Sequence, residues 1–199
     1  MTAIIPRWEW RTFGQDFGEA ESRIREHEAG NFKRSEEKYI LSAKSDENTK
    51  IRDDLMDIKS LQQVNGDKLE QWYPTMKENF PMPKEKLEVL FRDFFKVPVP
   101  AFQRDKYTYA EFLEELVRPC EALQVVDVYK ERLIFVINMA IVEIAETRFN
   151  GIPLRTVCIE HADPDNVMKT VRQLGLEGFE NINYIRAMKR TVGMGKEQA

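Results

Sequence analysis

Basic side chains recur in several short segments of this sequence, in pairs two or four residues apart or singly. These are Arg7 with Arg11, Lys50 with Arg52, Lys59, and Lys130 with Arg132. Residues two or four apart in a β-strand point to the same face, so each pair would place two positive charges on one side of a sheet. Glu9, Glu143 and Glu160 are interspersed among them. If a closing sheet gathers these faces, the mixture fits a polyphosphate held by Lys and Arg and a divalent cation held by carboxylates.

The same spacing is also typical of the solvent-exposed face of half-buried antiparallel strands. In that interpretation Lys and Glu form ordinary cross-strand pairs, each worth about a few tenths of a kcal/mol. Spacing alone therefore leaves two alternatives open, an anion-binding concave surface and a solvated strand face.

Composition narrows the classes of protein and partner. The chain has 199 residues, enough for one domain or two small ones. Lys and Arg number 30 against 34 Asp and Glu, so a net charge of −4 provides no general field for nucleic acid, and a phosphate site would be local. Cys120 and Cys158 suit neither a disulfide framework nor a paired-cysteine zinc site. The start, Met1 to Trp10, lacks a leader pattern and no stretch is long enough to span a bilayer, so we expect a cytoplasmic protein without a membrane partner.

Hydrophobic periodicity predicts mainly strands in the first part of the chain. The expected strands are Arg7 to Phe13, Glu36 to Ser42, Thr49 to Asp53, Leu55 to Leu61 and Lys68 to Tyr73. A short surface helix is expected over Asp16 to His27. Trp8 and Trp10 share the face opposite Glu9, where packing against a helix is favoured over stacking on a base.

A helical insertion is expected at about 81–123, following Pro81-Met82-Pro83. Lys84 to Lys96 places Leu and Phe residues on one helical face, which favours core packing over a partner groove. A second helix should start at Thr108, because Glu111 stands at capping-box spacing, and run to about Pro119. We treat 1–199 as a single domain that contains this insertion.

The last part of the chain returns to strands. Gln124 to Ile137 and Ala140 to Phe149 read as strands, and Asn150-Gly151 predicts a hairpin into Leu154 to His161. Asp163 and Pro164 predict a helix that ends at Gly175. Ile182 to Val192 fits either a strand or a helix. The pattern predicts an α+β protein with an antiparallel sheet.

The order of these segments resembles the CYTH-like, or triphosphate tunnel, superfamily over about residues 6–192. The family's opening ExExK strand resembles Arg7-Trp8-Glu9-Trp10-Arg11, and its EiE strand resembles Val157-Cys158-Ile159-Glu160. Its basic strands resemble Thr49 to Arg52, Asp57 to Lys59 and Tyr129 to Arg132, and its later acidic strand resembles Ile141 to Glu146. The relevant members are thiamine triphosphatases, inorganic triphosphatases and class IV adenylyl cyclases.

This resemblance implies an eight-stranded antiparallel β tunnel, closed or nearly closed, with flanking helices. It implies a triphosphorylated small molecule or another polyanion as ligand, and Mg²⁺ or Mn²⁺ as cofactor. The implied phosphate-binding residues are Arg11, Lys50, Arg52, Lys59, Lys130, Arg132 and Arg186. The implied metal ligands are Glu9, Glu143 and Glu160, and the implied catalytic set is Glu9, Glu160 and Lys59.

Two positions depart from the family pattern. Arg7 stands where the ExExK strand has its first Glu, and Cys158 stands where the EiE strand has its first Glu. Fewer carboxylates hold a hard divalent ion less tightly, and Arg7 favours an anion over a metal. Three functions therefore stay open: a metal-dependent triphosphatase, a non-catalytic anion-binding, nucleotide-binding or interaction module, and an adenylyl cyclase, for which no adenine pocket is identifiable. Substrate identity and oligomeric state are not predicted.

Cys158 and His161 also have a structural and a functional interpretation. A nucleophilic Cys158 would need a base, and no relation to His27 or His161 is evident, so a small apolar strand residue is favoured. His161 directly follows a strand, where a surface or capping role is more common than metal ligation.

Overall fold

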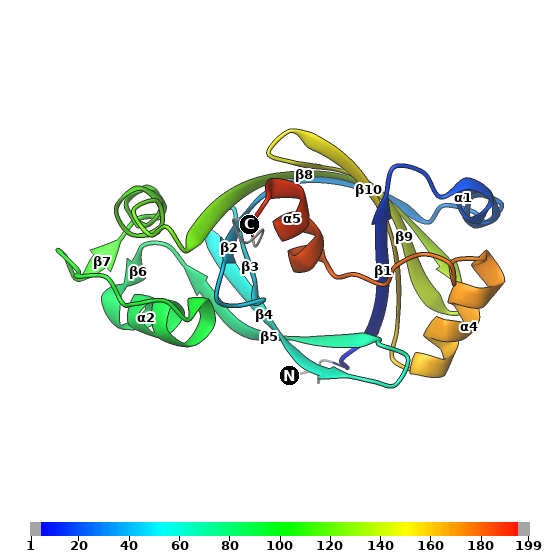
Figure 1. Ribbon diagram of the computed structural model, residues 1–199, viewed down its shortest axis with the longest axis horizontal. Helices are drawn as coiled ribbons and strands as arrows, with labels where there is room; N and C mark the ends of the chain where they lie inside the picture. Colours follow the sequence, from blue (N-terminus) through cyan, green and yellow to red (C-terminus); the bar gives the residue numbers. More distant parts are fainter. Residues whose placement is uncertain (1–4, 195–199) are drawn as a thin grey trace, which may run out of the picture.

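A computed structural model of the chain describes residues 5–194. Eight antiparallel strands close into a barrel in the order β1-β10-β9-β8-β2-β3-β4-β5, shown end-on in Figure 1. The strands are β1 Trp8–Gly14, β2 Asn31–Ser42, β3 Asn48–Arg52, β4 Leu55–Val64, β5 Glu70–Asn79, β8 Leu123–Ile137, β9 Ala140–Phe149 and β10 Ile152–His161. The predicted α+β fold, a closed eight-stranded antiparallel barrel with flanking helices, is confirmed.

Alternation along β1 and β10 places apolar side chains outside the barrel wall and polar groups inside it. Trp10, Val157 and Ile159 are buried in a cluster that includes residues of α1 Gly18–Arg25 and α4 Pro164–Leu174. The predicted packing of Trp8 and Trp10 against helices is therefore what the structure shows. The residues between these apolar positions, such as Glu9 and Glu160, face the interior of the barrel. The outer helices cover the apolar face of the barrel wall and form the hydrophobic core with it. The inner face is therefore not needed for that core and can carry charged side chains.

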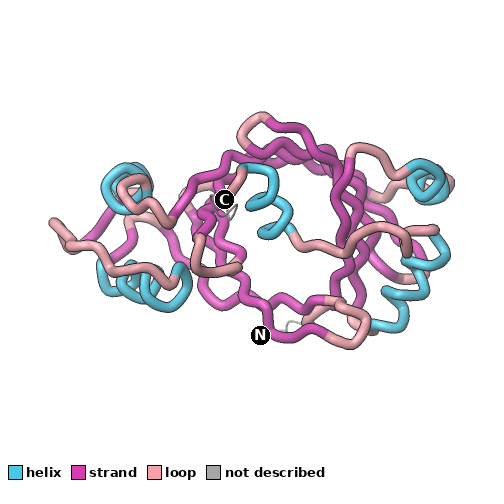
Figure 2. Tube along the Cα trace, viewed as in Figure 1, coloured by secondary structure: helices cyan, strands magenta, loops and turns pink. Residues whose placement is uncertain are grey.

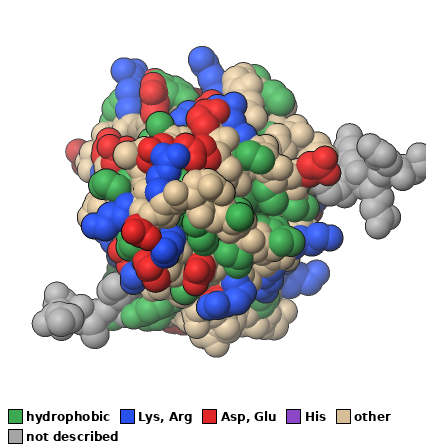
Figure 3. Space-filling view, turned by 90° about the vertical axis from the view of Figure 1, so that its left-hand side faces the viewer, with side chains coloured by type: hydrophobic (Ala, Val, Ile, Leu, Met, Phe, Trp, Pro, Cys, Tyr) green, Lys and Arg blue, Asp and Glu red, His purple; other side chains and the backbone are tan. Residues whose placement is uncertain are grey.

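The insertion between β5 and β8 packs against the opposite side of the barrel. It comprises β6 Met82–Pro83, α2 Lys84–Val89, η1 Leu90–Phe95, β7 Lys106–Tyr107, α3 Tyr109–Glu111 and η2 Phe112–Val117. Phe91, Phe95 and Phe112 are buried in one cluster with Ile51 and Ile58 of the barrel, so the Phe-rich helix is core as predicted. Figure 3 views the molecule from the side of the insertion, where side chains of both charge signs are interspersed with hydrophobic ones. The assignment of one domain stays a prediction.

Several boundaries differ from the sequence-based expectation. β2 begins at Asn31 instead of Glu36, because Asn31 to Ser42 pairs along β8 without interruption. β5 runs on to Asn79 instead of ending at Tyr73, because it pairs with β4 over that length. In the described range 5–194, no helix is long and apolar enough to cross a membrane.

The ambiguous segment 182–192 forms a helix, α5 Tyr184–Val192. The side chain of Asn183 accepts a hydrogen bond from the Arg186 N–H and so caps the first turn. Both ribbon views place α5 in the opening of the barrel ring (Figures 1 and 2). Its residues Tyr184, Ile185 and Met188 pack against the barrel residues Tyr39 and Phe149. The helix therefore fills part of the tunnel that the strands enclose.

Candidate functional site

A narrow cavity of about 160 Å³ lies inside the barrel, beside α5. Five cationic side chains and three carboxylates line it, namely Arg11, Lys50, Lys59, Lys130, Arg132, Glu9, Glu143 and Glu160. The cations come from β1, β3, β4 and β8, so only closure of the barrel brings them together. The site is thus a charged interior rather than a solvated strand face.

Two of the residues expected to bind phosphate lie elsewhere. Arg52 lines a wider pocket of about 540 Å³, where its guanidinium is 3.6 Å from Glu37. It lies two residues beyond Lys50 on β3, roughly 6.6 Å further along the strand, which carries it out of the narrow cavity. Arg186 is on α5, about 200° around the helix from Tyr184, and its guanidinium lies 3.5 Å from Asp46 and 3.9 Å from Glu70. Neither Arg52 nor Arg186 lines the narrow cavity, and their role in phosphate binding stays a prediction.

Lys130 is, with Arg11, one of the two buried cations of the cavity. Its Nζ donates hydrogen bonds to Glu37 at 2.8 Å and to the Tyr39 hydroxyl at 2.9 Å. Burial lowers the pKa of Lys130 to about 8, although Glu37 opposes that shift. Burial alone would raise the pKa of Glu37, but attraction and hydrogen bonding from Lys130 outweigh it and lower that pKa to about 2. At neutral pH both members of the pair are therefore charged. Raising the pH through about 8 neutralises Lys130, whereas Glu37 keeps its charge.

Tyr184 brings α5 into this charged interior. Its ring stacks on Tyr39 with 6.1 Å between centroids, with Lys130 Nζ 4.3 Å and the Arg11 guanidinium 4.8 Å from its centre. Such cation–π contacts stabilise buried charges. The side chain is buried, and in residues 5–194 its hydroxyl has no hydrogen-bond partner; the same holds for Arg132 Nε. Buried polar atoms are rarely left unsatisfied, so these two are available to a ligand.

Carboxylates face one another across the strands at the opposite side of the cavity. Glu9 on β1 is in register with Glu160 on β10 and with Glu70 on β5. Directly opposed like charges destabilise a sheet. Arg11 offsets part of this repulsion, with Nε 2.9 Å from Glu9 and a second nitrogen 3.5 Å from Glu143. Burial and the nearby Glu9 raise the pKa of Glu160.

Arg7 and Cys158, the two departures from the family pattern, both contact this carboxylate group. Arg7 is 3.6 Å from Glu160. The Cys158 thiol donates a hydrogen bond to Glu160 over 3.7 Å, and ligand atoms of Glu9, Cys158 and Glu160 all lie within 4.8 Å of one another. Glu143, the third expected metal ligand, is instead 3.9 Å from Arg132 and outside this group. Glu143 is the cross-strand neighbour of Cys158 and lines the same cavity, and its role as a metal ligand stays a prediction.

Cys158 is not activated as a nucleophile, and His161 has a capping role. Cys158 is 2% exposed, and burial raises the pKa of its thiol well above the ordinary value, so it is protonated and unreactive without a cation. His161 Nδ1 accepts a hydrogen bond from the Asp163 N–H at 2.9 Å, which is the capping role expected from the sequence.

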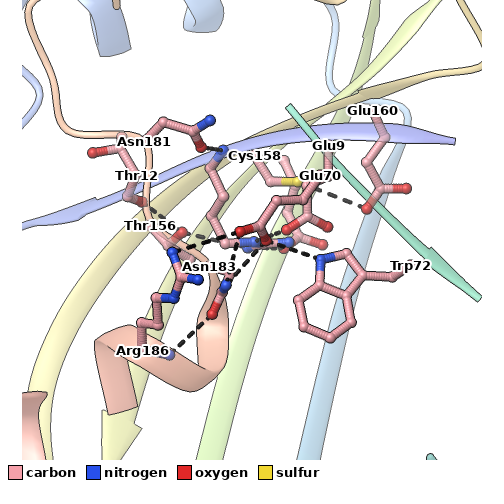
Figure 4. A network of polar contacts seen from close by, with 12 residues as sticks. Glu9, Thr12, Glu70, Trp72, Thr156, Cys158, Glu160, Asn181, Asn183 and Arg186 are labelled. Atoms are coloured by element: carbon pink, nitrogen blue, oxygen red, sulfur yellow. Dashed lines mark hydrogen bonds and ion pairs between the residues drawn. The ribbon is translucent and has the colours of Figure 1, made fainter. Parts of the chain in front are cut away.

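Several residues of the site were missed in the sequence. Figure 4 shows Glu70 accepting hydrogen bonds from Trp72 Nε1 at 3.1 Å and from Asn183 Nδ2 at 3.0 Å. Glu37 and Tyr39 had a usable signal, because they alternate along a strand that was itself predicted. Glu70 had the same signal, because it alternates with Trp72 on the predicted strand Lys68 to Tyr73. Asn183 had none, since it lies on a segment of undecided structure.

The fold and the site define a class: a closed antiparallel barrel whose interior is lined with both cations and carboxylates. No protein-family model matches the sequence. No curated protein matches it either.

Solved structures do match. A candidate adenylyl cyclase from Hippeastrum, HpAC1, described as having a dominant triphosphatase activity, aligns with a TM-score of 0.51 at 9% identity, covering 93% of this chain and 96% of that one. The PH1819 protein from Pyrococcus horikoshii aligns with a TM-score of 0.51 at 16% identity, covering 92% of this chain and 99% of that one. The chain therefore shares the fold of these two proteins, at low sequence identity.

The lowered pKa of Lys130 predicts a pH effect on anion binding. Between pH 7 and pH 9 Lys130 passes through its pKa of about 8 and becomes neutral. Anion binding favours the protonated amine, so affinity for tripolyphosphate should fall by up to about tenfold per pH unit above that pKa. Calorimetric titration at pH 7, 8 and 9 measures this. Lys130→Arg, whose guanidinium stays charged, should give a flatter profile. Equal profiles for the two proteins would assign the titration to tripolyphosphate itself.

Proposed function

We propose that this protein binds the triphosphate group of a small molecule inside the tunnel. One observation carries the proposal: five cations line a cavity of about 160 Å³, at which two buried donor atoms have no partner among the described residues. Lys and Arg form strong charge-assisted hydrogen bonds with phosphate oxygens. Lys50, Lys130 and Arg132 would bind non-bridging oxygens from one side, while Arg11 and Lys59 face the carboxylates.

The remainder of the small molecule has space outside the narrow cavity. A wider pocket of about 780 Å³ shares Glu9, Lys59, Trp72 and Glu160 with it. Pro74 and Ile141 also line that pocket. A triphosphate in the cavity could therefore carry an organic group that contacts Trp72. No more of the substrate's identity follows from these residues.

Hydrolysis of the bound triphosphate is the next step of the proposal. It is supported by the fold shared with the Hippeastrum protein, for which triphosphatase activity is described. In the family mechanism a divalent ion held by carboxylates polarises the transferred phosphorus. Glu9 and Glu160 would hold that ion here, with Lys59 beside them. Mg²⁺ requires oxygen ligands, however, and here a thiol and the guanidinium of Arg7 adjoin Glu160. The donor set fits Mg²⁺ poorly, so we expect weak turnover with that ion.

The second candidate function is non-catalytic binding of a triphosphate or nucleotide. It is favoured by Arg7 and Cys158 at positions where the family pattern has carboxylates. Cyclisation of ATP is a third candidate, because the Hippeastrum protein is also described as a candidate adenylyl cyclase. That reaction needs an adenine site, for which Trp72 offers one aromatic ring at the pocket of about 780 Å³.

Phosphate release from a panel of triphosphates tests hydrolysis. The panel contains tripolyphosphate, thiamine triphosphate and ATP, each with Mg²⁺, Mn²⁺, Co²⁺ or Zn²⁺, and ATP samples are also examined for cyclic AMP. We expect slow release that is lost in Glu9→Gln. Binding of tripolyphosphate without release from any mixture would select the non-catalytic function. Cyclic AMP as the main product would select the cyclase.

A further inference from the structure

We propose that Glu9, Cys158 and Glu160 form a binding site for a thiophilic divalent cation of the Zn²⁺ type, in place of the Mg²⁺ or Mn²⁺ implied by the family. The inference rests on the proposed function insofar as the cation would act in the same tunnel. It concerns metal selectivity, which can be measured without triphosphate and without activity.

The geometry of the three side chains carries the proposal. Their ligand atoms lie within 4.8 Å of one another, and Cys158 Sγ is 3.7 Å from Glu160 Oε1. In a tetrahedral zinc site with Zn–S of about 2.3 Å and Zn–O of about 2.1 Å, sulfur and oxygen ligands stand roughly 3.6 Å apart. The sulfur and the Glu160 oxygen therefore already have the separation that one shared zinc ion would require.

Strand pairing makes this arrangement a property of the barrel wall. Cys158 and Glu160 are two residues apart on β10, so they share its inward face, and Glu9 is paired directly with Glu160 from β1. Positions fixed by a sheet ladder are better defined than positions on a loop. A cation would also offset the repulsion between the opposed carboxylates Glu9 and Glu160.

The cavity gives an independent indication that something else binds beside these ligands. Tyr184 is 8% exposed and lines the same cavity as Glu9 and Glu160, and its hydroxyl has no partner in the described part of the chain. A water or an anion bound in this cavity would satisfy it. The opposed carboxylates are therefore not the only sign of a bound ligand.

Ligand chemistry decides between the metal classes. Mg²⁺ binds oxygen ligands in near-octahedral geometry and does not favour sulfur, whereas thiolates select softer ions such as Zn²⁺. A Glu₂Cys set leaves a fourth tetrahedral position open for water or a phosphate oxygen, as catalytic zinc sites do. Arg7 is about half exposed at its side chain, so it can move away from Glu160 when a cation enters.

Cobalt(II) absorption tests sulfur ligation directly. Co²⁺ replaces Zn²⁺ in such sites, and a thiolate ligand produces an intense near-ultraviolet charge-transfer band that oxygen ligands do not produce. We expect this band when Co²⁺ is added to the metal-free protein in a phosphine reductant, and expect equimolar Zn²⁺ to abolish it. Cys158→Ser should lose the band, whereas Cys120→Ser, which changes the other cysteine, should keep it.

A second measurement tests selectivity. Calorimetry gives the ratio of the Zn²⁺ affinity to the Mn²⁺ affinity. This ratio should be at least about tenfold higher in the wild-type protein than in Cys158→Glu, because the substitution replaces a sulfur ligand with oxygen. A band that persists in Cys158→Ser, or Co²⁺ binding without a band, would overturn the proposal. Tripolyphosphate binding in EDTA is followed separately, so failure of the metal site and failure of triphosphate binding are distinguishable.

Discussion

The double variant Lys130→Ala, Arg132→Ala should lose most of the thermal stabilisation that tripolyphosphate gives the wild-type protein. A ligand that binds only the native state, at one hundred times its dissociation constant, stabilises by about 2.7 kcal/mol. In a domain of this size that corresponds to a rise in melting temperature of about 5 to 10 °C. Both side chains line the narrow cavity, and Lys130 is buried, so their removal eliminates two of five positive charges there. Differential scanning fluorimetry with and without tripolyphosphate measures the change.

Two further variants make this result interpretable. Among the described residues, Lys130→Ala removes the closer of the two cations beside the buried Glu37 and leaves only Arg52, at 3.6 Å. Breaking a buried pair costs up to about 3 to 5 kcal/mol of folding free energy, so the double variant is also made with Glu37→Gln. Arg34→Ala is the matched control, because Arg34 pairs with Glu131 on the outside of the barrel and is exposed. The control should keep the full shift. An undiminished shift in the folded Lys130 and Arg132 variant would place the anion outside the tunnel.

The variant Arg7→Glu, Cys158→Glu should bind Mn²⁺ at least about tenfold more tightly than the parent, a gain of about 1.4 kcal/mol. Each substitution supplies hard oxygen ligands beside Glu160, from which Arg7 is 3.6 Å and Cys158 Sγ 3.7 Å distant. The guanidinium that repels a cation is removed at the same time. Isothermal titration calorimetry measures the affinity, and metal-dependent phosphate release should rise with it.

Stability is the main confounder for that variant. A new inward carboxylate at position 158 joins Glu9, Glu143 and Glu160, and without metal the four repel one another. We therefore expect a lower melting temperature in EDTA and a larger gain from Mn²⁺ than in the parent. Arg7→Gln serves as the control, since it removes the charge without adding a ligand. If the double variant is folded and its Mn²⁺ affinity is unchanged, positions 7 and 158 do not belong to a metal site.

Much of the barrel could be predicted from alternation alone. The period of two in β1, β8, β9 and β10 places charged residues opposite apolar ones, and Asn150-Gly151 fixes the hairpin between β9 and β10. The order of the charged strands then indicated the tunnel fold. The inward position of Lys50, Lys59, Lys130 and Arg132 follows from that fold, because one face of every strand must point inside.

The rest of the site depends on contacts that no local pattern encodes. Arg52 shares a strand face with Lys50, yet the depth of a residue along the tunnel is set by strand register, which periodicity does not provide. Tyr184 enters the cavity only because 184–192 is a helix that packs inside the ring. The Glu37–Lys130 pair joins residues far apart in sequence across β2 and β8. Such pairings require the closed barrel.

A crystal structure with tripolyphosphate, grown in EDTA, tests the central claim most directly. The account predicts the phosphate chain in the narrow cavity, with non-bridging oxygens within hydrogen-bond distance of Lys130 Nζ, Arg132 Nε and the Tyr184 hydroxyl. These are a buried cation of the cavity and the two donors of its lining that have no partner in residues 5–194. Tripolyphosphate bound at full occupancy elsewhere would contradict the account. An example is binding beside Arg52 and Arg148 in the pocket of about 540 Å³, with no tripolyphosphate in the tunnel.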